Sequence, residues 1–217
     1  MTDNIVQAFT ELAPCYEKTM DLELQFMWGL GYRDFVNRLV RVADIKEGER
    51  VLDIATGTAV IPLSICAKRE ADVQVIGLDI TPAMLRNGAR SVTQAQTASR
   101  IDLICASAMN VASADNVFDA VTCGLGMHHL DVAQTLQEIR RVLKDDGRLA
   151  MGTVGVPPLW RKWWGKRIVE QGVRTFYRLT HGGPRAEAEV EAFHNIHTKT
   201  EWLKLLRDFG FGSIEID

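Results

Sequence analysis

The sequence has few cysteines, no long apolar run and no excess of basic charge. Its four cysteines, Cys15, Cys66, Cys105 and Cys123, include no CxxC pair, so neither a disulfide framework nor a zinc ribbon is indicated. We expect these thiols to be reduced and buried, which is typical of a cytoplasmic protein. No apolar run approaches the roughly 20 residues that a membrane-spanning helix needs.

Other common features are also missing. The N-terminal stretch MTDNIVQAFTELAPC lacks the basic start and apolar block of a secretory signal. A formal net charge of −3 argues against general nucleic-acid binding. The 217 residues, 47% apolar and 24% charged, indicate one soluble globular domain with a sizeable core.

Short apolar runs alternate with helical patterns from residue 46 onward. Strands are predicted at 50–54, 73–79, 101–106, 117–125, in the second half of 144–154 and at the end of 199–217. Such alternation indicates an α/β fold with a doubly wound, mainly parallel sheet. Residues 1–45 are expected to form a helical cap, 46–155 the ligand-binding core, 156–198 an insertion after the fifth strand, and 199–217 the last helix and strand. Asp131 and Thr81 are expected to cap helices.

The stretch VLDIATGTAVIPLS, residues 51–64, places an acid before a short glycine-containing loop. A dinucleotide would need glycines at the positions of Ala55, Gly57 and Val60, and the Asp53 carboxylate would repel its pyrophosphate. S-adenosylmethionine carries positive charge and no phosphate, so an acid there favours it. Asp79 ends the second strand, 22 residues after Gly57, where it can accept hydrogen bonds from ribose hydroxyls. The alternative is that both acids merely cap a loop and a helix.

Four stretches resemble class I S-adenosylmethionine-dependent methyltransferases: VLDIATGTA, VIGLDITPAMLRNGA, NVFDAVTCGLGMHHL and EIRRVLKDDGRLAM. The opening AFTELAPCYEKTM is similar to the Phe-x-x-x-Ala-x-x-Tyr start of the menaquinone/ubiquinone C-methyltransferase group. The resemblance covers residues 5–154 well and 155–217 loosely. It implies a single Rossmann-like methyltransferase domain. The cofactor-binding residues that it implies are Tyr16, Asp53, Ala55, Gly57, Thr58, Asp79, Ile80, Met84, Ser107, Ala108 and Gly124.

This sequence departs from the family pattern at several places. Ala59 stands where the loop usually has its last glycine, and Ser107 stands where an acid usually contacts the adenine. The run GLGMHHL replaces the Gly-Phe-Gly-Leu-Arg-Asn run of the quinone enzymes. The chain also stops in the sixth predicted strand, where family members normally continue into a seventh.

Histidines are the candidate proton acceptors. His128 and His129 follow the fourth strand, at the edge of the predicted cofactor crevice, and we expect one of them to act as base or acceptor contact. The alternative is that they cap the next helix. His194 and His197 have a spacing that can hold a metal, but no third ligand is evident, so no metal is predicted.

The segment 157–185 has the most unusual composition, with seven Lys/Arg against one Glu among five aromatic residues. It is interpreted as a substrate lid, as a packed helix, or as a peripheral contact with an anionic membrane. The expected function is transfer of a methyl group to a small aromatic or lipophilic acceptor. The alternatives are a non-catalytic S-adenosylmethionine-binding protein and an NAD-dependent oxidoreductase.

Overall fold

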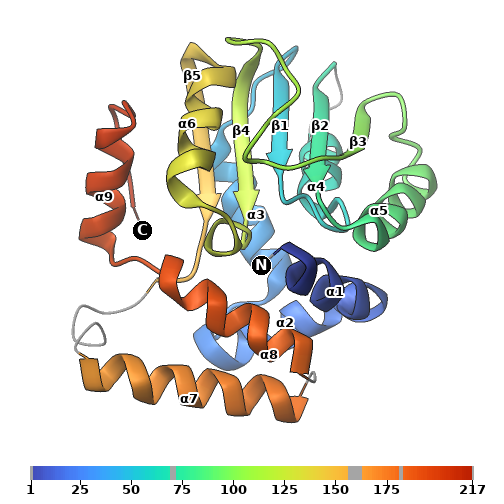
Figure 1. Ribbon diagram of the computed structural model, residues 1–217. Coiled ribbons are helices and arrows are strands. Elements are labelled where there is room, and N and C mark those ends of the chain that lie inside the picture. The colour runs from blue at the N-terminus through green and yellow to red at the C-terminus, as the bar shows by residue number, and fades with distance from the viewer. Residues whose placement is uncertain (1, 69–71, 156–162, 181–182, 217) are drawn as a thin grey trace.

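A computed structural model describes residues 2–68, 72–155, 163–180 and 183–216 (Figure 1). Its centre is a five-stranded sheet in the order β3-β2-β1-β4-β5, with every neighbouring pair parallel. The strands are β1 Arg50–Ile54, β2 Gln74–Asp79, β3 Ile101–Cys105, β4 Phe118–Gly124 and β5 Leu143–Gly152. The doubly wound fold that the alternation predicts is therefore confirmed.

Helices cover both faces of the sheet, because consecutive strand residues point to opposite sides. On one face Leu52 and Ile54 of β1 pack in a core with α6 Val132–Val142 and α9 Lys199–Asp208. On the other face Val51 packs with α3 and α4 in a second core. The helices of this face are α3 Tyr32–Ala43, α4 Val60–Lys68 and α5 Pro82–Gln94.

The remaining helices gather below the carboxyl ends of the strands (Figure 1). They are α1 Thr2–Leu12, η1 Ala13–Cys15, α2 Tyr16–Trp28, α7 Trp163–Thr180, α8 Gly183–Ala192 and η4 Phe193–Asn195. A small apolar cluster that includes Leu12, Tyr16 and Met20 joins the N-terminal helices to Met84 of α5. The ligand-binding edge of the sheet is thus covered by segments from both ends of the chain.

The predicted sixth strand is wrong over the residues that the structure describes, which form no strand after α9. Gly210 ends α9 in a left-handed backbone with φ of 82°, and the Phe211 amide donates back to the Leu206 carbonyl at 2.9 Å. The Ile216 carbonyl accepts from the Lys199 side chain instead of a neighbouring strand. Ile214 and Ile216 still pack against the core of α6 and α9, so the apolar pattern fixed their burial but not their conformation.

The expectation that all four cysteines are buried needs adjustment. Cys66 and Cys123 are buried, but Cys15 and Cys105 are exposed, because Cys105 ends the edge strand β3 and Cys15 ends η1. Of the segment 157–185, residues 157–162, 181 and 182 lie outside the described residues. Among the residues that are described, none of the helices combines the length and apolar content needed to cross a membrane.

Candidate active site

A cavity that is partly open to solvent lies where β1, β2 and β4 end. This is the edge at which parallel α/β sheets bind ligands. The structure brings eight of the expected cofactor residues to its wall. These are Tyr16, Ala55, Gly57, Asp79, Ile80, Met84, Ala108 and Gly124.

The loop after β1 is held in an unusual backbone conformation. Ala55, Gly57 and Ala59 all have left-handed φ angles, of 52°, 57° and 62°. Each non-glycine residue in this region costs about 1–2 kcal/mol, so the surrounding contacts must stabilise the loop. A Cβ atom placed on Gly57 would lie 3.1 Å from Cε of Met84, inside the cavity wall.

Asp79 joins two loops at the cavity. Its Oδ2 accepts a hydrogen bond from the Gly57 amide at 2.9 Å, and its Oδ1 accepts from the Thr81 amide at 2.8 Å. Burial raises the pKa of the Asp79 carboxyl, and these backbone hydrogen bonds oppose the increase. Each oxygen keeps a second lone pair, so the carboxylate can still accept hydrogen bonds from a ligand in the cavity.

Three predicted cofactor residues do not line the cavity. Asp53 is fully buried behind the wall, because Thr122 of the adjacent strand donates a 2.5 Å hydrogen bond to its Oδ1. The Thr58 hydroxyl donates to Glu17 at 3.0 Å, and the Ser107 hydroxyl accepts from its own turn at 3.2 Å. The expectation that Asp53 faces the crevice is therefore wrong. The sequence analysis also missed Ala106, which lines the cavity beside Ala108.

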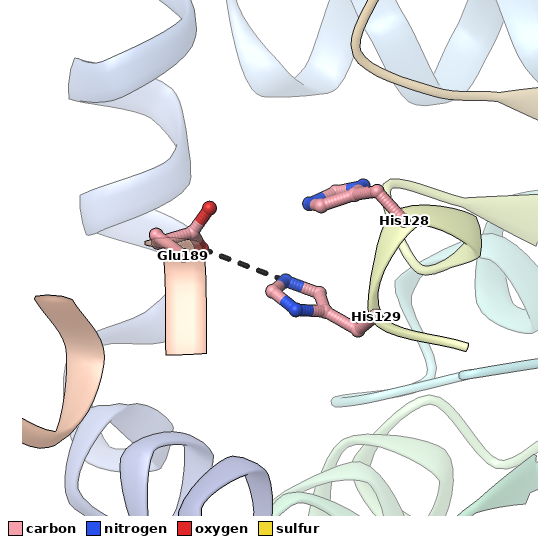
Figure 2. Close-up of side chains that lie close together, drawn as sticks. All are labelled: His128, His129 and Glu189. Atoms are coloured by element: carbon pink, nitrogen blue, oxygen red, sulfur yellow. Dashed lines mark ion pairs between the residues drawn. The ribbon is translucent and has the colours of Figure 1, made fainter. Parts of the chain in front are cut away.

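The two histidines take different positions in the short helix η2 Met127–His129 (Figure 2). His129 lines the cavity, and its Nε2 lies 3.5 Å from Oε1 of Glu189 on α8. His128 is buried behind it, and this burial lowers the pKa of the His128 imidazole to about 3. The alternative capping role is wrong, because Asp131 caps α6 by accepting from the Gln134 amide at 2.9 Å.

His128, His129 and Glu189 are also close enough to hold a metal ion, since their ligand atoms lie within 4.8 Å of one another. However, Nη2 of Arg185 lies 2.8 Å from the same Glu189 oxygen. A guanidinium at this position opposes a second cation, so the absence of a metal stays our prediction. Of the other histidine pair, His197 packs against Trp202 at 5.1 Å between ring centroids, and the His194 side chain lies outside the described residues.

The sequence analysis missed the cluster formed by Glu23, Arg185 and Glu189. Arg185 and Glu189 lie one helical turn apart on α8, and Glu23 of α2 lies 3.8 Å from Arg185 Nη2. The i, i+4 spacing of Arg185 and Glu189 in GPRAEAEVEA is the signal that predicts a shared helix face. Nothing in the sequence connects that face with Glu23 or His129.

The raised pKa of the buried Asp53 can be tested through the pH dependence of stability. Burial raises the pKa of Asp53 to about 7 from a usual value near 3.8, so the folded protein holds a proton that the unfolded chain has lost. The free energy of unfolding should therefore fall as pH rises from about 4 to about 7, by up to about 4 kcal/mol. Asp53→Asn should remove this decrease and exceed the wild type in stability at pH 8. Urea unfolding at pH 4 and pH 8 measures both, and parallel pH profiles would contradict the assignment.

Comparison with known proteins shows the family of this chain. Residues 2–156 match the model of the ubiE/COQ5 methyltransferase family. The chain is 34% identical over 158 residues to the ubiquinone/menaquinone biosynthesis C-methyltransferase UbiE of Geotalea uraniireducens, covering 72% of this chain and 66% of that relative. It is 32% identical over 181 residues to the demethylmenaquinone methyltransferase of Lactiplantibacillus plantarum, covering 80% and 74%. The chain therefore spans slightly less than two thirds of the first relative.

Solved structures share the fold. Phosphoethanolamine N-methyltransferase 2 of Haemonchus contortus, solved with phosphomonomethylethanolamine and S-adenosylhomocysteine, superposes with a TM-score of 0.68 at 20% identity. The match covers 95% of this chain and 45% of that one. At this identity the similarity establishes a Rossmann-like architecture and carries no statement about the acceptor.

Proposed function

The chain belongs to the ubiE/COQ5 methyltransferase family, and we propose that it transfers a methyl group from S-adenosylmethionine to a carbon of a small quinol-like ring. The names of the two relatives support this acceptor class. The observation that carries the proposal is one cavity in which Asp79 and the Gly57 loop lie together with His129 and apolar side chains.

The donor side of the cavity fits S-adenosylmethionine and not a dinucleotide. Among the described residues no lysine or arginine lines the cavity, whereas the Asp79 carboxylate does. A pyrophosphate would lack a cationic partner there, while a sulfonium and an ammonium group are favoured by the acid. An NAD-dependent reaction is thus not supported.

Each wall residue has a proposed role toward the donor. Asp79 accepts from the ribose hydroxyls, and Tyr16 covers the cofactor from the N-terminal cap. The backbone at Ala55, Gly57 and Gly124 passes close to the methionine part. The adenine ring lies against apolar side chains, which are Ile80, Met84, Ala106 and Ala108. Asp53 acts from behind the wall by joining β1 to β4 through its hydrogen bond with Thr122, and Thr58 and Ser107 act by holding their loops.

His129 is the proposed general base. Its Nε2 faces Glu189, and its buried Nδ1 has no hydrogen-bond partner among the described residues. A proton held on Nε2 by Glu189 leaves the Nδ1 lone pair free to take the proton of a ring hydroxyl. The resulting oxyanion raises the electron density of the adjacent ring carbon, which takes the methyl. That carbon then releases its own proton to solvent, while His129 returns a proton to the ring oxygen. S-adenosylmethionine, when bound, supplies an electrophilic methyl and leaves as a neutral thioether.

The domain organisation follows from these roles. We propose a single methyltransferase domain in which 46–155 binds the donor, 1–45 caps it, and 199–217 completes the packing. Within 156–198, the described helices α7 and α8 form the proposed acceptor lid, because α8 brings Glu189 to His129. Such a lid excludes water from the acceptor and fixes its orientation.

Gly57 provides the test of donor binding. Gly57→Ala should weaken adenosylhomocysteine binding about 10-fold or more, because the new methyl enters the cavity wall next to Met84. Gly48→Ala is the matched control, since Gly48 has a similar left-handed φ of 77° but no atom within 4 Å of its Cβ position. Thermal shift measures both, with NAD as the competing ligand. A shift with NAD but not with adenosylhomocysteine would overturn the proposed function.

His129 provides the test of catalysis. His129→Ala should lower kcat for methylation of a demethylmenaquinol analogue by about 10²–10⁴, while adenosylhomocysteine still binds. Added imidazole should restore part of the rate. The control is His197→Ala, because His197 packs against Trp202. Mass spectrometry of the product identifies the methylated atom, and an unchanged rate in His129→Ala would refute the assignment. Donor binding without turnover of any quinol or phenol tested would indicate a non-catalytic protein.

We also propose that α2 and α7 contact an anionic membrane surface, with the protein otherwise in the cytoplasm. Phe26 of α2 is 78% exposed and Leu179 of α7 is 82% exposed. The two helices meet where Phe26 stacks on Phe176, with 6.0 Å between ring centroids. Exposed arginines of α7, Arg174 and Arg178, supply charge for anionic headgroups. A lipophilic quinol would enter from this surface.

Vesicle binding tests the membrane contact. The double variant Phe26→Ser/Leu179→Ser should reduce the fraction that sediments with phosphatidylglycerol-containing vesicles at least about fivefold, because it removes apolar area from the contact. Val42→Ser is the control, since Val42 is 57% exposed on α3. Equal sedimentation of all three proteins would contradict the contact.

A further inference from the structure

Arg185 lies in a buried cluster of charged groups beneath the lid helix α8. Its Nη2 is 2.8 Å from Glu189 and 3.8 Å from Glu23, and the guanidinium is almost completely shielded from solvent. The Tyr177 hydroxyl donates to Glu23 at 3.1 Å. The cluster thus ties α8 and α7 to α2, and Glu189 extends it to His129.

The guanidinium is only partly satisfied. Arginine has five N–H donors, and both Nε and Nη1 of Arg185 are buried without a hydrogen-bond partner among the described residues. An unpaired donor on a buried charge is costly, so such a group in a native site calls for a ligand or a water that is not part of the chain. The ion pairs on Nη2 hold the guanidinium in place, and the N–H donors on Nε and Nη1 keep unused hydrogen-bonding capacity.

The position of Arg185 identifies the ligand as the acceptor. Its guanidinium carbon lies 4.8 Å from the centre of the Phe9 ring. Phe9 lines the cavity and makes an edge contact with His129, with 5.2 Å between ring centroids. Arg185 is therefore one side chain, Phe9, behind the wall of the cavity that His129 also lines.

We propose that Arg185 determines acceptor specificity by binding an anionic oxygen on the acceptor ring, next to the atom that is methylated. This inference rests on the proposed function and extends it. A planar guanidinium donates parallel hydrogen bonds to an oxyanion and stays protonated throughout, so Arg185 stabilises the charge that His129 creates and takes no proton itself. The acceptor is thereby an aromatic ring that bears an ionised hydroxyl or a carboxylate.

Direct binding to the adenosylhomocysteine-loaded protein tests the inference. Calorimetry at neutral pH compares 2-hydroxy-1,4-naphthoquinone, whose ring hydroxyl is ionised, with its uncharged 2-methoxy ether, and 1-hydroxy-2-naphthoate provides the carboxylate. We expect the wild type to bind at least one anion about 10-fold or more tightly than the ether, and the preferred anion identifies the source of the oxygen. Arg185→Met should abolish this preference and change the Kd of the ether less than about threefold.

Controls separate specificity from folding. Arg207→Met removes an exposed arginine in the last turn of α9, outside the cluster, and it should keep the full preference. If Arg185→Met does not fold, the double variant Arg185→Met/Glu189→Gln removes one charge of each sign and is expected to lose the preference in its place. Arg185→Lys keeps the positive charge but lacks the two parallel N–H donors of a guanidinium, so it should retain only part of the preference for the anion over the ether.

Three results would overturn the inference. They are equal binding of anions and ether by the wild type, an unchanged preference in Arg185→Met, and anion binding that requires a divalent cation and disappears in His128→Ala. The last result would assign the His128, His129 and Glu189 cluster to a metal. Failure of adenosylhomocysteine itself to bind would refute the proposed function, whereas its binding without any anion preference refutes this inference alone.

Discussion

The Asp79 carboxylate is the interaction on which the cavity depends. It accepts from the amides of Gly57 and Thr81, and so it fixes the loop after β1 against the start of α5. Without it the left-handed loop of Ala55, Gly57 and Ala59 would lose a hydrogen-bond partner that offsets its backbone strain. One side chain thus shapes the donor site and supplies its negative charge.

Several ionisable groups around this cavity are buried, and their surroundings favour different protonation states. Burial raises the pKa of Asp53 to about 7, whereas burial lowers the pKa of His128 to about 3. Both pKa shifts favour the neutral form of the side chain, because its hydrogen bonds do not compensate for the hydration that burial removes. The pKa of Glu189 is instead lowered, because the favourable charges of Arg185 and His129 outweigh its burial. A carboxylate that stays ionised can orient the imidazole of His129 over the working pH range.

The sequence predicted the sheet and most of the residues that line the cavity, because both follow from local features. Strand-end residues such as Ala55, Asp79 and Gly124 meet at one edge in any parallel sheet of this order. The orientation of Asp53 was not predictable, since its contact with Thr122 depends on the register of β1 against β4. The prediction of a last strand was wrong for a similar reason. The apolar pattern at Ile214 and Ile216 specifies that these side chains are buried, but not that their backbone pairs with a neighbouring strand. Arg185 and Glu23 come from opposite ends of the chain, and no local pattern links them.

The division of the site between two parts of the chain has a consequence for specificity. The family match ends at residue 156, so the donor loops lie inside it, while Arg185 and Glu189 of α8 lie beyond it. The quinone enzymes that the sequence resembles carry an arginine in the run after the fourth strand, where this chain has His128 and His129. The Arg185 guanidinium of α8 is connected to this loop through Glu189, which lies beside His129. Under the proposed function, the positive charge beside the acceptor comes from α8, the same helix whose Glu189 lies beside His129, so acceptor recognition and orientation of the base would depend on one helix.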